Sequence, residues 1–208
     1  MQPDWPSTVA ALNNGTPTSA PDLHALLVAH LHEARRTIAG SNEDAYRHFW
    51  NEDPHQLLGP KPEESCRDAL LRLIRDKLAR LAVTVEPEGD MVSDKRADLV
   101  AFVPGAKVPI GLKRDYHADV WTAAQSQLER AYTRDPETSG YGIYLALWFG
   151  EGRPKSMQRR PGSGSRPATW MEMEEMLRQT IPADQRTRLA VVVVDVTDPH
   201  SEHRGSRG

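Results

Sequence analysis

Two short runs of sequence are apolar over nearly their whole length, and they constrain the fold more than any other feature. They are YGIYLALWF at residues 141–149 and LAVVVVDV at residues 189–196. A strand with one face in water alternates apolar and polar residues, whereas a strand covered on both faces is apolar almost throughout. The two runs therefore predict buried strands in a sheet that helices cover on both sides.

The segments around these strands predict the other elements of an α/β domain. An apolar stripe at helical spacing follows Pro62, a residue that the first turn of a helix tolerates. Pro104-Gly105 is a favoured turn dipeptide between two strand-like runs, and Thr169 with Glu172 forms a capping box. The predicted order is helix 62–80, strands 81–87, 95–103 and 107–114, a helix from 119 that carries Trp121, Gln125, Leu128 and Tyr132 on one face, strand 141–149, a helix from 169, and strand 189–196.

The first 58 residues differ from the rest and predict a short helical segment. Apolar residues recur at helical spacing over residues 23–38. Ser41 with Asp44 resembles a capping box for a second short helix, whose apolar side is formed by Ala45, Phe49 and Trp50. The loop-like opening suggests a chain cut from, or once joined to, a longer polypeptide. We expect an N-terminal helical segment at 1–58, a main domain at 59–199 and a disordered tail at 200–208.

Composition excludes several classes of protein. The 208 residues contain one cysteine, Cys66, which excludes an internal disulfide framework and a multi-cysteine zinc site and favours a reducing compartment. The longest apolar run, at 189–194, is far shorter than the roughly 20 residues needed to span a bilayer. These features predict a soluble, cytoplasmic protein without a membrane partner. The net charge of −3 provides no overall attraction to nucleic acid, so any such binding must depend on local basic patches.

Asp98 and Lys113 lie on two adjacent predicted strands, in KRADLVAFV and KVPIGLKR. Magnesium prefers hard oxygen ligands and keeps several waters, so one or two carboxylates and a backbone carbonyl suffice to hold it. A lysine near the ion could orient an attacking water or stabilise charge on a phosphate. The pair therefore indicates a site for metal-dependent phosphodiester cleavage, with Mg²⁺ as cofactor and Mn²⁺ as a substitute. The simpler interpretations are that Asp98 pairs with Lys95 or Arg96, and that Lys113 ends a solvated strand.

The order of elements, with the aspartate on the second strand and the lysine on the third, resembles the PD-(D/E)XK nuclease superfamily, or restriction-endonuclease-like fold, over residues 60–198. The resemblance implies a mixed sheet flanked by helices, in the order αβββαβαβ, with one or two magnesium ions held by Asp98 and the backbone carbonyl of Leu112. The segments KRADLVAF, VPIGLKRDYH and GYGIYLALWFG look like domains fused to larger bacterial proteins, some of them linked to defence. The implied activity is hydrolysis of DNA, more than of RNA.

Gly111 departs from that pattern, because the superfamily carries an acid two residues before the lysine, on the same face of the strand. Either another acid reaches the same place, or the substrate phosphate and water complete the metal shell. The best candidate for such an acid is Glu63, which lies in the middle of the stripe formed by Cys66, Leu70 and Ile74. The resemblance supports this choice, since members often have a functional glutamate on the first helix; Glu64 is the reserve. A glutamate at a helix N-terminus is also favourable through its charge alone.

Further candidates follow the lysine and occupy one later loop. Gln127, on the second predicted helix, resembles a glutamine that touches the site in some branches of the superfamily. The loop EGRPKSMQRRPGSGSRP at 151–167 is rich in arginine and could neutralise phosphates by counterion release, or could simply be a solvated loop. It has no base-reading pattern, so tight sequence specificity is not expected. The predicted nucleic-acid contacts are Arg114, His117, Arg153, Lys155, Arg159 and Arg160.

Three functions stay open at this point. The first is a metal-dependent nuclease, as the effector domain of a larger protein. The second is a module of the same fold that has lost catalysis through Gly111 and binds nucleic acid or a protein partner. The third is a structural domain whose N-terminal helices dock a partner, in fusion, association or an oligomer.

Overall fold

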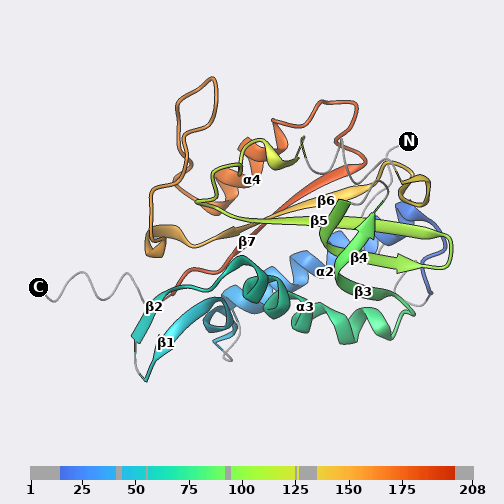
Figure 1. Cartoon of the computed structure of the whole chain (residues 1–208), viewed down its shortest axis with the longest axis horizontal. Helices are drawn as coiled ribbons and strands as arrows, with labels where there is room; N and C mark the ends of the chain where they lie inside the picture. The colour runs from blue at the N-terminus through green and yellow to red at the C-terminus, as the bar shows by residue number, and fades with distance from the viewer. Residues whose placement is uncertain are drawn as a thin grey trace, which may run out of the picture.

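A computed structural model of the chain describes residues 15–40, 44–54, 56–91, 95–124, 126 and 135–199. Its centre is a mixed five-stranded sheet in the order β3-β4-β5-β6-β7, in which β3 to β5 are antiparallel and β5 to β7 are parallel (Figure 1). Three α-helices flank the sheet in the described part of the chain. The bounds are α2 Ala20–Gly40, α3 Glu63–Ala79, β3 Thr84–Met91, β4 Lys95–Val103, β5 Ala106–Arg114, β6 Gly142–Trp148, α4 Trp170–Arg178 and β7 Leu189–Asp195.

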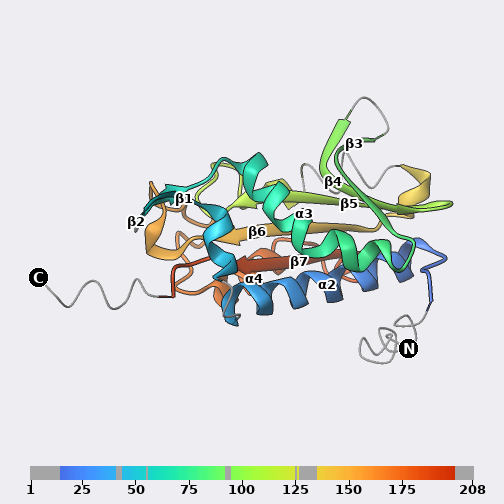
Figure 2. The ribbon, with the colours of Figure 1, turned by 90° about the horizontal axis from the view of Figure 1, so that it is seen from below.

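The sheet is covered on both faces, as its apolar strands predict. Alternate residues of β6 enter two separate hydrophobic clusters: Leu145 packs with α2 and α3 on one face, whereas Ala146 packs with α4 and residues 120–124 on the other. Every residue of β6 is buried. Figure 2 shows α2 and α3 together on one side of the sheet. The α/β class with a mixed sheet flanked by helices is therefore confirmed.

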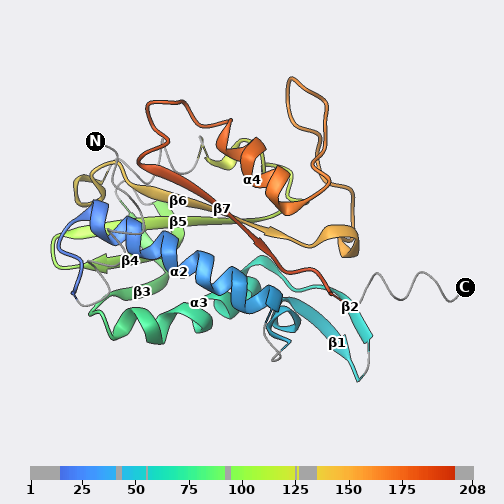
Figure 3. The ribbon, with the colours of Figure 1, turned by 180° about the vertical axis from the view of Figure 1, so that it is seen from behind.

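The N-terminal helix α2 belongs to the same hydrophobic cluster as the sheet. Leu23, Leu27 and Leu31 are fully buried with Leu145 and Val192. Figure 3 shows α2 crossing the sheet beside β7. This helix therefore contributes to the core that supports β5 and β6.

The segment after α2 differs from the predicted second α-helix. It forms a 3-10 helix, η1 Ala45–Phe49, and a two-stranded hairpin of β1 Trp50–Asp53 and β2 Gln56–Pro60. Asp44 has a left-handed φ of 49° and makes no side-chain cap, while Ser41 lies outside the described residues. Trp50 explains the difference, because its indole donates to the Val196 carbonyl (2.7 Å) and its ring packs edge-on against Phe149. This long-range anchor draws the chain out of the helix.

Three other predicted boundaries agree with the structure to different degrees. The strand expected from residue 81 begins at Thr84, because Ala82 adopts φ 57° and Val83 donates back to the carbonyl of Leu78 at the end of α3. The capping box of α4 is confirmed: Thr169 accepts from the backbone of Glu172, whose carboxylate accepts from Ala168. The helix expected from residue 119 begins with turns, and Gln125, Leu128 and Tyr132 lie outside the described residues.

The outer edge of β7 is capped by side chains from the two flanking helices. Glu174 of α4 accepts from the backbone N–H of Val193 (2.8 Å), and Arg35 of α2 pairs with Glu174 (2.8 Å) and donates to the Val193 carbonyl (3.3 Å). The guanidinium of Arg35 also stacks on Trp170, 4.3 Å from the ring centroid. This Arg35–Glu174 clasp satisfies backbone groups that an edge strand otherwise leaves open.

We expect Glu174→Ala to lower the free energy of unfolding by about 1–3 kcal/mol, because the Val193 N–H loses its acceptor and Arg35 loses its ion pair. Glu175→Ala is the matched control on the same helix, since Glu175 forms an exposed pair with Arg178 and should change stability by less than about 1 kcal/mol. Urea unfolding of both variants measures the difference. Equal losses would show that the clasp contributes nothing specific.

Stability should fall in acid because of His24, a buried residue of α2. Burial lowers the pKa of His24 to about 4 from an ordinary value of 6.5. The unfolded chain therefore binds this proton first, so the stability is fully present above pH 6.5 and is lost as the pH falls towards 4. The loss from this residue should reach roughly 2 kcal/mol at pH 5.

The measurement is urea unfolding of wild type and His24→Leu at pH 7.5 and pH 5. The variant should show a pH-dependent loss smaller by roughly 2 kcal/mol. Burial also lowers the pKa of His32 to about 4, so His32 should make the same contribution to the pH dependence of stability in both proteins. An unchanged pH dependence in the variant would contradict the assignment to His24.

Candidate functional site

The sheet divides at Asp98 and Gly111. The pairing of β4 with β5 runs from Val103↔Ala106 to Leu99↔Ile110, whereas β4 stays paired with β3 down to Lys95 and β5 stays paired with β6 up to Arg114. Figure 2 shows the β3–β4 hairpin curling away from β5 beyond this point. A gap between separating strands leaves backbone groups that need other partners.

Asp98 occupies the gap. Its carboxylate Oδ2 accepts a 2.7 Å hydrogen bond from the backbone N–H of Leu112 on β5. The side chain thus takes the place of a β4 carbonyl and ties the two diverging strands together. This contact is a structural role that the sequence did not predict, and it also fixes the direction of the carboxylate.

Lys113 reaches the same place from β5 and is nearly buried. Its ammonium Nζ lies 2.9 Å from the Leu112 carbonyl oxygen, 2.8 Å from Glu63 Oε1 and 3.8 Å from Asp98 Oδ2. The exposed fractions of the side chains are 8% for Lys113, 22% for Glu63 and 30% for Asp98. The lysine therefore lies between two carboxylates that retain partial access to solvent.

Glu63 is placed by the start of α3. The apolar stripe of Cys66, Leu70 and Ile74 packs this helix against the sheet, so its first residue faces the end of β5. Glu63 Oε2 accepts from the backbone N–H of Arg114 (3.3 Å), while Glu64 is exposed. The structure thus brings together Asp98, Lys113, Glu63 and the Leu112 carbonyl, and it leaves Glu64 apart.

Burial dominates the electrostatics of Asp98. It raises the pKa of the carboxyl, against the opposing effects of the Lys113 charge and the Leu112 hydrogen bond, and the nearby Glu63 raises it further. The two carboxylates are therefore close enough to repel one another. A cation between them relieves that repulsion, and Lys113 supplies it here.

Tyr144 is a neighbour of the site that sequence reasoning missed. It lies in register with Gly111 on the adjacent strand, is fully buried, and donates from its hydroxyl to the Val120 carbonyl (2.8 Å). Burial, followed by the charges of Glu63 and Asp98, raises its pKa well above the ordinary value. The signal was available, because in-register residues on neighbouring strands share a face of the sheet.

The oxygen atoms of this site are of the type that binds a divalent cation. Two carboxylates and a carbonyl are the oxygen ligands that magnesium prefers, and one or two carboxylates are enough when water fills the other positions. In the described part of the chain no group of three or more histidine, cysteine, aspartate or glutamate side chains could hold a metal ion. The oxygens of Glu63 and Leu112 that the sequence assigns to the metal are bonded to Lys113 Nζ. A metal ion would therefore compete with this ammonium.

The predicted nucleic-acid contacts are scattered by the structure. Arg114 turns inward, where it donates to the Lys61 carbonyl and stacks on Tyr116, and the His117 ring accepts from the Asp119 backbone. Arg153 pairs with the buried Asp115 (3.2 Å). Arg159 and Arg160 bond to Gly164 and Gln179, Lys155 is exposed, and Gln127 lies outside the described residues.

Comparisons with known proteins place the chain in a family without assigning an activity. A family described as "Domain of unknown function (DUF8371)" matches residues 25–151, which contain Glu63, Asp98 and Lys113. No curated protein matches the chain, and no solved structure matches it. None of the helices in the described residues has the length and apolar character needed to cross a membrane. Because the match covers more than half of its length, the chain belongs to the DUF8371 family.

Proposed function

We propose that this domain is a metal-dependent nuclease that hydrolyses phosphodiester bonds of DNA, built on the restriction-endonuclease-like core of the PD-(D/E)XK superfamily. The observation that carries the proposal is the convergence of Asp98, Glu63 and Lys113 where β4 separates from β5. Three charged side chains from three elements meet at a place that is partly open to solvent.

Each residue has a role that its contacts allow. Asp98, Glu63 and the Leu112 carbonyl would hold the metal, which when bound supplies a hydroxide and positive charge against the phosphate. Lys113 has three donors on a flexible stem, so it can release Glu63 and turn towards a phosphate oxygen. Asp98 stays oriented because the Leu112 N–H holds one of its oxygens.

The test is a cleavage assay with plasmid and single-stranded DNA and with RNA, in Mg²⁺ and in Mn²⁺. The expected result is metal-dependent cutting of DNA that is lost on substitution of Asp98 or Lys113. Absence of any cutting in wild type, or cutting that survives both substitutions, rejects the proposal.

A second candidate is a module that binds nucleic acid or a protein partner without cutting. Two features favour this second candidate. Gly111 provides no carboxylate, and Glu63 is already bonded to Lys113, so both features weaken the binding of a metal ion. Gly111 does not adopt a positive φ, so the backbone accepts a side chain there. If only the acid is missing, Gly111→Glu should switch on metal-dependent cutting in an inactive protein. Continued inactivity of a folded, metal-binding variant would contradict that explanation.

The cellular setting follows from the same proposal. A reducing cytoplasm suits a chain with one cysteine, Cys66, and burial raises the pKa of its thiol to about 12 and keeps it unreactive. As the effector of a larger bacterial defence protein, the domain would need control by a fused or associated regulatory part.

A further inference from the structure

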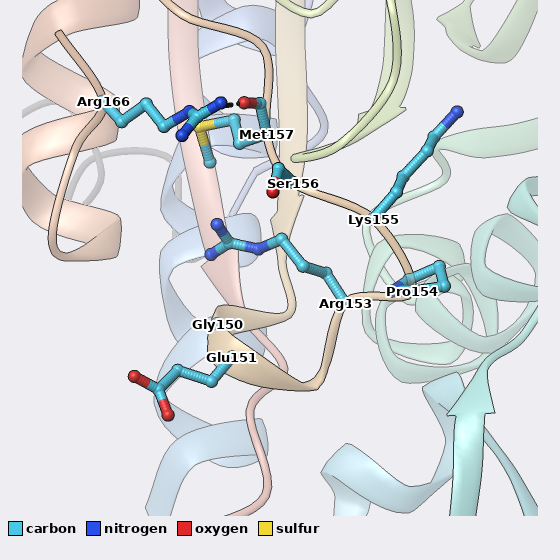
Figure 4. Close-up of a pocket in the computed structure, with 8 residues that line it drawn as sticks. All are labelled: Gly150, Glu151, Arg153, Pro154, Lys155, Ser156, Met157 and Arg166. Carbon is cyan, nitrogen blue, oxygen red and sulfur yellow. Dashed lines mark hydrogen bonds between the residues drawn. The ribbon is translucent and has the colours of Figure 1, made fainter.

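A hollow of about 480 Å³ lies after the end of β6, the strand that runs parallel to β5. Gly150, Glu151, Arg153 and Pro154 form one wall, and the lining continues through Lys155, Ser156 and Met157 to Arg166. The lining therefore combines three cationic side chains with one acid, in a protein whose net charge is −3. Figure 4 shows Arg153 and Arg166 reaching towards the Met157 stretch, whereas Glu151 and Lys155 point away from it.

Both arginines are held in place before any ligand arrives. Arg153 pairs with Asp115 Oδ2 at 3.2 Å and lies over the ring of Trp148, 4.8 Å from its centroid. Arg166 donates from Nε to the Met157 carbonyl at 2.8 Å. A guanidinium has five donors, so these anchors leave N–H groups for a ligand. Side chains that are already ordered lose little entropy on binding.

Asp115 connects the hollow to Lys113. It is fully buried two residues beyond the lysine, and its backbone N–H donates to the Leu147 carbonyl of β6 at 2.9 Å. Asp115 lies in the turn that directly follows β5, and β5 runs parallel to β6 with Arg114 in register with Leu147. Arg153, which pairs with Asp115, is therefore held at the same end of the sheet as Lys113.

We propose that the Arg153–Arg166 hollow binds a phosphate group, and that in the working protein this phosphate belongs to the nucleic-acid strand that the neighbouring site cuts. Planar guanidinium groups match phosphate oxygens through paired hydrogen bonds, and a concave basic surface concentrates anions. The assignment to a nucleic-acid strand rests on the proposed function. The phosphate site itself does not, because it can be measured without metal and without cleavage.

The test is a titration of the full chain with inorganic phosphate in EDTA. NMR monitors the signal of the Trp148 indole N–H, which is assigned by its disappearance in Trp148→Phe. Inorganic phosphate should shift this signal saturably, with a dissociation constant on the order of millimolar. Arg166→Gln should weaken binding about tenfold, while Lys155→Gln, which removes the same charge from a side chain that points away, should change it less than about twofold. No saturable shift, or equal effects of the two variants, overturns the site.

A second titration identifies the source of the phosphate. A thymidine dinucleotide with a phosphorothioate link should compete with inorganic phosphate and bind more tightly, because its sugar and base add contacts. Binding of inorganic phosphate without binding of the dinucleotide overturns the assignment to a nucleic-acid strand. A protein that binds both but never cuts would separate this inference from the proposed nuclease activity.

Discussion

Replacing Lys113 with methionine is expected to abolish cleavage and, in the same protein, to strengthen the binding of Mn²⁺. The ammonium bonds Glu63 and the Leu112 carbonyl, the oxygens that a metal would need. Its removal leaves two carboxylates without their cation. Because a metal ion no longer competes with the ammonium for these oxygens, a gain in Mn²⁺ affinity on the order of tenfold, or about 1.4 kcal/mol, is expected.

Cleavage by the same variant should fall by about a hundredfold or more, because the cation that acts on the phosphate is lost. The variant should also lose about 2 kcal/mol of stability in EDTA, less than for a fully buried pair because Glu63 and Asp98 are partly exposed. Mn²⁺ should restore this loss. Electron paramagnetic resonance titration, urea unfolding and the cleavage assay measure the three effects.

Lys107→Met is the matched control for this substitution. Lys107 lies on the same strand and also pairs with two acids, Asp135 (3.6 Å) and Glu137 (2.6 Å). Its removal should leave cleavage unchanged. If Lys113→Met binds Mn²⁺ no better than wild type, the ammonium does not occupy the metal position.

Replacing Asp98 with asparagine is expected to remove metal binding and cleavage while leaving the fold intact. Asparagine keeps an oxygen that can accept from the Leu112 N–H, so β4 and β5 stay tied. Burial already raises the pKa of the Asp98 carboxyl, so the loss of the charge should alter stability by less than about 1 kcal/mol. Mn²⁺ affinity should drop by about tenfold and cleavage by about a hundredfold or more.

Asp68→Asn provides the comparison, because Asp68 is a half-exposed acid on α3 that pairs with Arg67. It should bind Mn²⁺ and cut as wild type does. Two outcomes argue against the assignment of Asp98. Retained cleavage in Asp98→Asn would exclude it from the site, and unfolding of the variant would make its contact with Leu112 its main role.

The predicted parts of this structure are those that local pattern determines. Apolar runs identified β6 and β7, the stripe from Cys66 identified α3, and the turn at Pro104-Gly105 separated β4 from β5. The proximity of Asp98 and Lys113 followed from the same information, since strand pairing and alternation of faces fix which side chains meet. The placement of Glu63 followed from the phase of one helix together with the resemblance to the PD-(D/E)XK superfamily, whose members often have a glutamate on the first helix.

The unpredicted parts depend on contacts between residues far apart in the sequence. Trp50 looked like the end of a helix until its anchor at Val196 was known, and Arg153 looked like a loop cation although it is bound to Asp115. The separation of β4 from β5 at Asp98 was also not predicted, because the sequence of one strand does not determine where its pairing with the next strand ends. The Lys113 ammonium lies among the predicted metal ligands because β4 separates from β5 at this point.

The Arg35–Glu174 clasp limits how copies of this protein could associate through their sheets. Continuous growth of a fibre needs two free margins on every molecule, one to receive a strand and one to offer the next. Because side chains of α2 and α4 occupy the β7 edge at Val193, strand addition to the five-stranded sheet is left to the side of β3. Pairing through the β3 edges can join two molecules into a dimer, and it leaves no free edge of the five-stranded sheet for a third molecule.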